Sequence, residues 1–391
     1  MTRNIGVISR GIRGPIIRSG DDLVTIVADS LESAVKSENI ILSDNDILGI
    51  TEAVVGKSQQ NFVFLTDIKE EIESKYNREI GIVFPIMSRN RFSNILKGIA
   101  MGVDKVYIQL SYPGDEVGNK LISQERLDDT DLNPYSDTLT EEEFYNVFGD
   151  IKHEFTGVDY VQLYKSICEG KATVIFSNDP KAILNYTKDV LAADIHTRQR
   201  TKRILKNAGA NIVYGLDDLL NKSINGSGYN PEYGLLGSNL SSDDRLKLFP
   251  RDCKEFVYAV QEEIKKRLDV TLNILVYGDG CFKDSVEGIW ELADPVASPG
   301  YTDRLNGVPN EMKLKYIADT KLKDMSQEEA QEEMKKLINE KPKTNTTMSS
   351  QGTTPRKITD LLASLCDLTT GSGDKGTPFV LIQGYFDTYA D

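Results

Sequence analysis

Two turns rich in glycine and aspartate lie in the last third of the chain, each beside an apolar segment. The first, at residues 278–281, follows a predicted strand at 273–277, and the second, at 371–376, precedes a predicted strand at 379–382. Glycine lets phosphate oxygens approach backbone N–H groups, and aspartate can hold a divalent metal ion bound to those phosphates. The pair of turns predicts a nucleoside triphosphate site. Ordinary surface turns are the alternative, because glycine and aspartate are common turn residues.

Composition limits the classes of protein to consider. The 391 residues are 39% hydrophobic, which suits two or three packed domains, and the net charge is −14. A nucleic-acid-binding protein more often carries a basic face, so we expect no nucleic-acid partner. No apolar run reaches the roughly 18 residues of a membrane span, so we expect no membrane partner. The 4 cysteines lack CxxC spacing, which argues against a zinc or disulfide scaffold and favours a cytoplasmic location.

The first half of the chain is predicted to contain parallel α/β units. Strands are expected at residues 80–86 and 105–110, with a helix at 89–100 between them. Ligands of α/β sheets gather outside the carboxyl ends of strands. Asp115 and Asn119 follow the strand at 105–110, so they are candidate site residues, although a plain turn explains them equally well.

Further elements are expected along the rest of the chain. An acidic surface excursion at 121–150 precedes a second α/β repeat at about 155–220. Apolar residues at helical spacing predict an amphipathic helix at 250–268. The last third is expected to contain a strand at 313–318 and a surface insertion at 323–354.

Three segments resemble the coenzyme F420-0:L-glutamate ligase family, the γ-glutamyl ligases. Residues 13–23 (RGPIIRSGDDL) are similar to its opening G-x-P-x-I-x-x-G-D-D-L segment, and residues 46–58 (DILGITEAVVGKS) to its next strand and loop. Residues 371–380 (GSGDKGTPFV) are similar to its closing loop and strand. The likeness extends over roughly residues 4–60, 105–120, 245–320 and 355–391, and its first and last segments are specific as a pair.

The resemblance implies a GTP-dependent ligase of coenzyme F420 biosynthesis, with ATP as the other nucleotide to test and Mg²⁺ or Mn²⁺ as the metal. A carboxylate on a cofactor-like acceptor is activated as an acyl phosphate, and the amine of L-glutamate then attacks it to form an amide. Such phosphoryl transfer needs positioned phosphates and metal ions more than acid–base residues, so the presence of only 2 histidines is no obstacle. The resemblance also implies a homodimer.

The resemblance assigns roles to individual residues. Asp115 and Lys57 are the expected catalytic residues, and Asp115, Asp279 and Asp374 the expected metal ligands. Lysine is a suitable point charge for a nucleotide phosphate. The expected nucleotide-binding residues are Gly14, Pro15, Ile16, Ile17, Glu52, Ala53, Lys57, Asn119, Thr370, Gly371, Ser372, Gly373, Asp374 and Gly376.

The sequence departs from the family pattern at three places. Asp279 matches the family's metal-binding aspartate only across a short gap, and the neighbouring threonine ligand is absent. Ser372 stands where the family has a metal-binding glutamate, so Asp374 would have to serve instead, or one metal ion would be bound differently. About 120 extra residues, roughly 121–240, interrupt the ligase core and leave the identity of the acceptor open.

We expect an α+β fold with mixed sheets, in which a ligase core at 1–120 and 241–391 carries an inserted α/β lobe at 121–240. The leading functional hypothesis is an amide-forming ligase that joins L-glutamate, or a similar amino acid, to a small carboxylate acceptor. Ser372 and the missing threonine motivate an alternative, a non-catalytic nucleotide- or metabolite-binding protein on the same scaffold. Another enzyme on this core, such as a phosphotransferase, is a third hypothesis.

Overall fold

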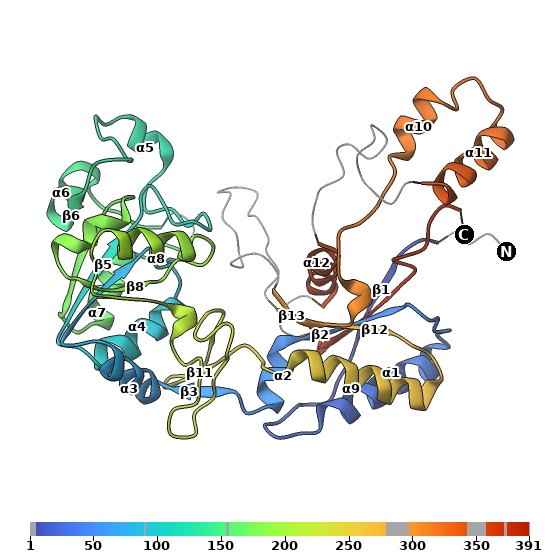
Figure 1. Ribbon diagram of the computed structural model, residues 1–391, viewed down its shortest axis with the longest axis horizontal. Helices are drawn as coiled ribbons and strands as arrows, with labels where there is room; N and C mark the ends of the chain where they lie inside the picture. The colour runs from blue at the N-terminus through green and yellow to red at the C-terminus, as the bar shows by residue number, and fades with distance from the viewer. Residues whose placement is uncertain are drawn as a thin grey trace. The chain divides into compact units, whose positions relative to one another are not determined.

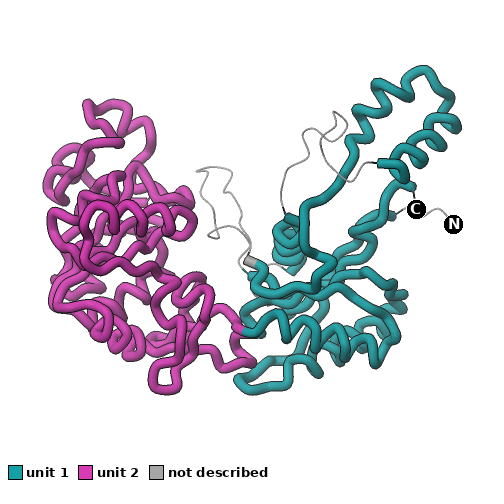
Figure 2. The backbone as a smooth tube through the Cα atoms, viewed as in Figure 1, with its two compact units in different colours: residues 1–55, 252–280, 295–391 teal, residues 56–251, 281–294 magenta. Residues whose placement is uncertain are grey.

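The chain divides into two compact units (Figure 2), and no sheet contains strands of both. The computed structural model describes residues 5–89, 91–153, 156–278, 297–341, 357–370 and 374–390. Unit 1 comprises Met1–Val55, Asp252–Gly280 and Pro295–Asp391, and unit 2 comprises Gly56–Arg251 and Cys281–Asp294.

Unit 1 contains a mixed five-stranded sheet in the order β1-β14-β2-β12-β13 (Figure 1). Strand β2 pairs parallel to β12, while the β1–β14, β14–β2 and β12–β13 pairs are antiparallel. Its elements are β1 (Ile8–Ile12), α1 (Leu23–Glu38), β2 (Ile47–Thr51), α9 (Cys253–Leu268), β12 (Asn273–Gly278), β13 (Ala297–Tyr301), η3 (Asp303–Leu305), α10 (Leu314–Thr320), α11 (Gln327–Asn339), α12 (Ile358–Thr370) and β14 (Phe379–Gln383).

Helices cover both faces of the unit 1 sheet. On one face, apolar residues of α1 and α9 pack against every second residue of the strands, such as Leu48 and Ile50 of β2 and Val276 of β12. On the other face, α12 packs against Ile47 and Leu275, among others. Neighbouring residues of one strand, such as Ile47 and Leu48, pack on opposite faces because successive side chains of a strand point to opposite sides of the sheet. Both faces are buried, which explains why these strands are apolar throughout.

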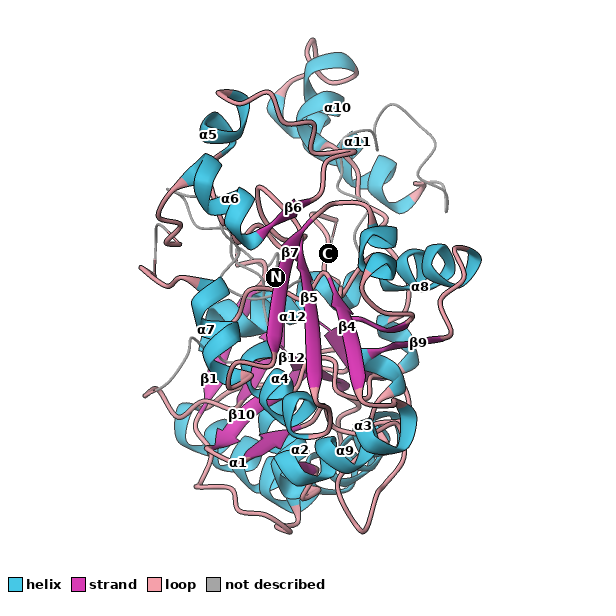
Figure 3. Ribbon diagram, turned by 90° about the vertical axis from the view of Figure 1, so that its left-hand side faces the viewer, coloured by secondary structure: helices cyan, strands magenta, loops and turns pink. Residues whose placement is uncertain are grey.

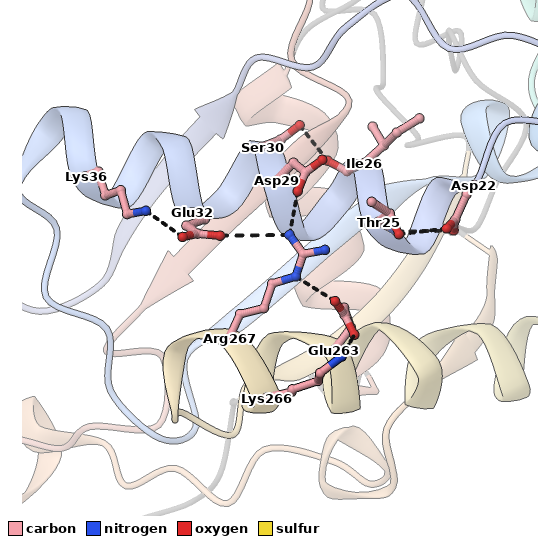
Figure 4. Close-up of polar contacts among 10 residues, drawn as sticks. All are labelled: Asp22, Thr25, Ile26, Asp29, Ser30, Glu32, Lys36, Glu263, Lys266 and Arg267. Carbon is pink, nitrogen blue, oxygen red and sulfur yellow. Dashed lines mark hydrogen bonds and ion pairs between the residues drawn. The ribbon is translucent and has the colours of Figure 1, made fainter.

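Helices α1 and α9 are also joined by an ion-pair network around Arg267 (Figure 4). The Arg267 guanidinium pairs with Asp29, with Glu263 at 2.6 Å and with Glu32 at 3.8 Å. Asp29 is largely exposed, and exposed pairs contribute at most about 1 kcal/mol. The apolar seam between the helices is therefore the main source of their association.

Gly49 lets α12 lie close against strand β2. A Cβ atom at this position would overlap Cys366 Sγ of α12 and would lie 3.4 Å from the ring of Tyr277. We expect Gly49→Ala to lower the free energy of unfolding by about 1–3 kcal/mol through overpacking. Thermal unfolding measures the loss, with Gly6→Ala as the control, because no atom lies within 4 Å of a Cβ built there.

A second variant tests the cause of that loss. Adding Cys366→Ala to Gly49→Ala removes the overlapping sulfur, so the double variant should recover part of the stability in a double-mutant cycle. Purely additive losses would show that the Cys366 contact is not the reason that position 49 is glycine.

Unit 2 contains a six-stranded sheet and a small three-stranded sheet of β10, β11 and β3. The larger sheet has the order β6-β7-β5-β4-β8-β9 and is parallel except for β6. The strands of unit 2 are β3 (Phe62–Phe64), β4 (Glu79–Val83), β5 (Lys105–Leu110), β6 (Leu139–Thr140), β7 (Ala172–Phe176), β8 (Asp189–Ala192), β9 (Ile212–Gly215), β10 (Asn239–Ser242) and β11 (Arg245–Lys247). Its helices are α3 (Leu65–Lys75), α4 (Phe92–Met101), α5 (Gln124–Asp128), α6 (Glu141–Phe148), α7 (Tyr160–Ile167), η1 (Pro180–Asn185), α8 (Arg198–Asn207) and η2 (Leu216–Asp218).

The parallel strands of unit 2 are covered on both faces, as parallel sheets usually are. Strands β7, β5 and β4 lie side by side in Figure 3. Their large core cluster packs with α3, α4 and α7, while a smaller cluster on η1 and α8 contains Val83, Ile183 and Leu205. Every parallel strand after β4 is reached through an intervening connection that contains helix, which is the pattern of a doubly wound α/β fold.

The predicted α+β fold with mixed sheets is confirmed, but two finer expectations differ from the structure. The expected boundary at residue 120 falls inside unit 2, because β4 and β5, before that boundary, share a sheet with β7, β8 and β9 after it. The strand expected at 313–318 is wrong, since these residues belong mostly to helix α10. Leu314 and Ile317 are three residues apart, a helical spacing, and Ile317 is buried with α11 residues.

No helix among the described residues combines the length and the apolar character needed to cross a membrane.

Candidate functional site

One edge of the unit 1 sheet gathers several of the residues predicted to bind a nucleotide. Strands β1, β2 and β12 run in the same direction and end at this edge, where the antiparallel strand β14 begins. The backbone N–H of Gly14 donates to the carbonyl of Gly376 at 3.1 Å, and that of Thr51 donates to the carbonyl of Pro378 at 3.1 Å. These bonds bring the N-terminal and C-terminal predicted segments together.

Gly14 is required at this edge for steric reasons. A Cβ atom there would lie 2.9 Å from Pro378 Cγ, closer than real Cβ atoms come, and 3.0 Å from the Phe379 ring. Of the neighbouring predicted residues, Ile17 is buried in the unit 1 core and Ile16 is 86% exposed. Ile16 is therefore available for an apolar contact with a ligand, whereas Ile17 anchors the segment.

Glu52 and Thr370 lie near one another beside Tyr277, at the end of β12. Glu52 is buried and begins helix α2 (Glu52–Ser58), while Thr370 ends α12. Burial raises the pKa of Tyr277 well above its usual value, with smaller contributions from Cys366 and from the charges of Asp367 and Glu52, and the Thr370 side chain lies at its hydroxyl. Tyr277 was expected only as a strand residue, because a tyrosine in an apolar strand carries no local signal of function.

Helix α2 corrects one expectation for the segment that carries Glu52, Ala53 and Lys57. A loop was expected here from the resemblance, but residues 52–58 form a helix directly after β2. Glu52 in its first turn suits the positive end of the helix dipole. Lys57, near its end, is exposed to solvent and is available to an anionic ligand.

The remaining predicted residues of this edge are only partly described. Asp279, Gly371, Ser372 and Gly373 lie outside the described residues. Asp374 is exposed to solvent. Within the described ranges, no three His, Cys, Asp or Glu side chains form a group that could hold a metal ion.

Asp115 lies in unit 2, in the loop that follows β5, and its carboxylate is saturated with hydrogen bonds. Its Oδ1 accepts the backbone N–H groups of Val117 at 3.1 Å and Asn119 at 2.9 Å. Its Oδ2 accepts the N–H of Met87 at 2.8 Å and the Asn119 side-chain amide at 2.8 Å. Asp115 therefore organises this loop and ties it to the segment after β4, and Asn119 serves the same arrangement.

The protonation of Asp115 should make stability depend on pH. Burial raises the pKa of Asp115 to about 6, although hydrogen bonds from Asn119, Met87 and Val117 lower it. Because this pKa lies above the value of 3.8 for an unperturbed aspartate, the folded state binds the proton more tightly than the unfolded state. Its contribution to stability is full at low pH and is lost as the pH rises through about 6.

We therefore expect the wild-type chain to gain about 1 kcal/mol of unfolding free energy between pH 7 and pH 5, relative to Asp115→Asn. Urea denaturation of both proteins at the two pH values measures this difference, and other acidic groups cancel in the comparison. The same pH dependence in both proteins would show that a group other than Asp115 binds this proton.

The comparison with protein families covers nearly the whole chain. Residues 11–384 match the model of F420-0:Gamma-glutamyl ligase. The chain belongs to this family. No curated protein sequence matches it. The F420-0:gamma-glutamyl ligase match includes both units, so residues 121–240 lie within the matched range.

Membership of the F420-0:gamma-glutamyl ligase family makes the protein an amide-forming ligase. Within unit 1, the fold brings Gly14, Glu52, Thr370 and Gly376 to one edge of the sheet. Asp115 and Asn119 are placed together in unit 2, after strand β5.

Proposed function

We propose that the protein is a GTP-dependent ligase that joins L-glutamate, or a similar amino acid, to a carboxylate on a cofactor-like acceptor of the F420-0 type. The acceptor carboxylate is first activated as an acyl phosphate, and the amine then displaces the phosphate. The observation that carries the proposal is the convergence of Gly14, Glu52, Thr370 and Gly376 at one edge of the unit 1 sheet.

Each part of this edge would have a definite role in nucleotide binding. No atom lies within 4 Å of a Cβ built on Gly376, so the backbone there leaves room for close approach of phosphate oxygens, and Gly14 holds the N-terminal segment against it. Pro15, Ile16, Ala53 and the residues 370–374 would complete the nucleotide contacts. Lys57 would neutralise phosphate charge.

The proposed metal ligands are Asp115, Asp279 and Asp374, for Mg²⁺ or Mn²⁺. The exposed carboxylate of Asp374 fits this role because it is accessible. Asp115 fits it less simply, since a directly bound ion would have to displace at least one of four N–H donors. When bound, the ions would supply charge stabilisation for the transferring phosphoryl group.

We also propose a location and an oligomeric state for the enzyme. The family's small-molecule chemistry supports a cytoplasmic enzyme of coenzyme F420 biosynthesis. We also propose a homodimer, which analytical ultracentrifugation of the full chain would test.

Calorimetry with GTP and ATP, each with and without Mg²⁺ or Mn²⁺, is the first test of the proposed function. Metal-dependent binding of one nucleotide is expected, followed by release of phosphate when L-glutamate and F420-0 are added. Absence of binding by both nucleotides under every metal condition would overturn the nucleotide site.

A non-catalytic nucleotide- or metabolite-binding protein is the second candidate. It is favoured by Ser372 at the position of a family metal ligand and by the saturated carboxylate of Asp115. Nucleotide binding without any release of GDP or ADP in the presence of amino acid and acceptor would support this second candidate over the ligase.

A further inference from the structure

Strand β1 leaves one edge of the unit 1 sheet open. It pairs with β14 on one side, and no strand of the described residues pairs with it on the other. Such an edge presents unpaired backbone N–H and C=O groups, which natural proteins usually protect or pair. The opposite edge is protected, because β13 contains Pro299 and pairs irregularly with β12. Strand β1 has no proline and a regular register, so its edge suits a further strand.

A groove runs along the open side of β1, between this strand and helix α1. It has a volume of about 570 Å³, and no residue of β14 lines it. Its walls include apolar side chains such as Ile12 and Ile26 and small ones such as Ser33 and Ala34. The small side chains of α1 leave room for atoms of another chain beside the strand.

The two ends of this groove carry opposite charges. Arg13 follows the end of β1, whereas Glu38 ends α1 near the start of β1. The position of Glu38 follows from an adjoining cavity that it lines together with Gln383, the strand partner of Ile8. Arg13 and Glu38 are exposed, and neither forms an ion pair within the described part of the chain. Glu38 accepts only the hydroxyl group of Ser37, at 3.5 Å.

This arrangement of charges is complementary to itself. In an antiparallel pair of β1 strands from two copies, the start of one strand lies beside the end of the other, so Glu38 of each copy faces Arg13 of the other. A strongly acidic or strongly basic partner would instead place a like charge against one end. Pairing would also withdraw Ile5 and Val7, which are 61% and 51% exposed just before β1, from water.

We propose that two copies of this chain pair antiparallel through β1 across a twofold axis, so that their unit 1 sheets become one continuous sheet. Pairing centred on Gly11, which is exposed and has no side chain, keeps the two Arg10 guanidinium groups from facing each other. The inference rests on the homodimer proposed above, for which it names the interface, and it does not depend on the ligase chemistry.

Sedimentation of the full chain over a range of concentrations measures the dissociation constant of the dimer. Arg13→Glu and Glu38→Arg should each weaken the dimer by at least about tenfold, because each places like charges at both ends of the interface. The double variant restores opposite charges, so its dissociation constant should return to within about threefold of wild type. Lys97→Glu and Glu142→Arg are the matched controls, since both residues are exposed on unit 2 helices, and they should leave the dimer unchanged.

Hydrogen exchange tests the strand pairing itself. Amide protection in peptides covering residues 7–13 should rise with protein concentration, whereas peptides from β13 should exchange at one rate throughout. Thermal unfolding checks that each variant folds.

The outcomes separate this interface from the other proposals. A dimer that resists both charge reversals, that the double variant does not restore, or that leaves residues 7–13 unprotected would overturn the β1 interface while the homodimer stands. A wild-type chain that stays monomeric would overturn both. Calorimetry with GTP decides the nucleotide site independently of either result.

Discussion

Phe144→Ala is expected to lower the free energy of unfolding of unit 2 by about 3–5 kcal/mol, the usual cost of truncating a fully buried phenylalanine. Phe144 of α6 is completely buried and stacks on Phe176 of β7, with ring centroids 3.8 Å apart. It also contacts Phe148 and the edge of Tyr112, the residue from which the loop carrying Asp115 continues. The variant should therefore loosen both the sheet and this loop.

Hydrogen exchange followed by mass spectrometry can locate that loss. Peptides from β5 and β7 should exchange faster in Phe144→Ala, while peptides from β2 and β12 should keep their protection, because each unit has its own core cluster. Phe64→Ala is the matched control, since Phe64 is 46% exposed in unit 2, and it should cost less than about 1 kcal/mol. Equal loss of protection in both units would show that they unfold as one.

Lys57→Ala is expected to weaken GTP binding by about 10- to 100-fold, the range of 1.5–3 kcal/mol for a hydrogen bond to a charged group. Lys57 is exposed near the end of α2, the helix that begins with the buried Glu52. Its removal should leave the fold intact, because its side chain is not part of a core cluster. Calorimetric titration with GTP and Mg²⁺ measures the effect.

Lys97→Ala is the control for overall charge, because Lys97 is an exposed lysine on helix α4. It should bind GTP as the wild type does. Lys57→Arg keeps the charge and should recover most of the affinity. Unchanged GTP affinity in Lys57→Ala would remove this lysine from the nucleotide site and leave the glycine-containing backbone as its main phosphate contact.

The strands were the features most readily predicted from sequence. The strand expected at 105–110 is β5, and those expected at 273–277 and 379–382 correspond to β12 and β14. Continuous apolar runs bounded by turn residues carry this information locally. The strand prediction for residues 313–318 was wrong because a short alternating run fits a helix and a strand equally well. The packing of this segment against α11 favours the helix.

The candidate site was predictable only in part. Gly14 and Gly376 could be placed in one site from the resemblance, whose paired end segments come together across the sheet. Tyr277 was missed, because its position between Glu52 and Thr370 depends on three separate elements. The saturation of Asp115 by Met87, Val117 and Asn119 could not be foreseen either, since it depends on how two loops approach each other.

The sequence by itself determined that this chain forms an α+β protein of the ligase family, because strand patterns and the end motifs are local. The tertiary structure alone decided the order of the strands, and with it the grouping of β4 and β5 with β7, β8 and β9 in unit 2. It also brought Glu116 to the N-terminus of α8 beside Asp194. Sheet order and such charge pairings arise from contacts between residues far apart in the chain, which local patterns do not encode.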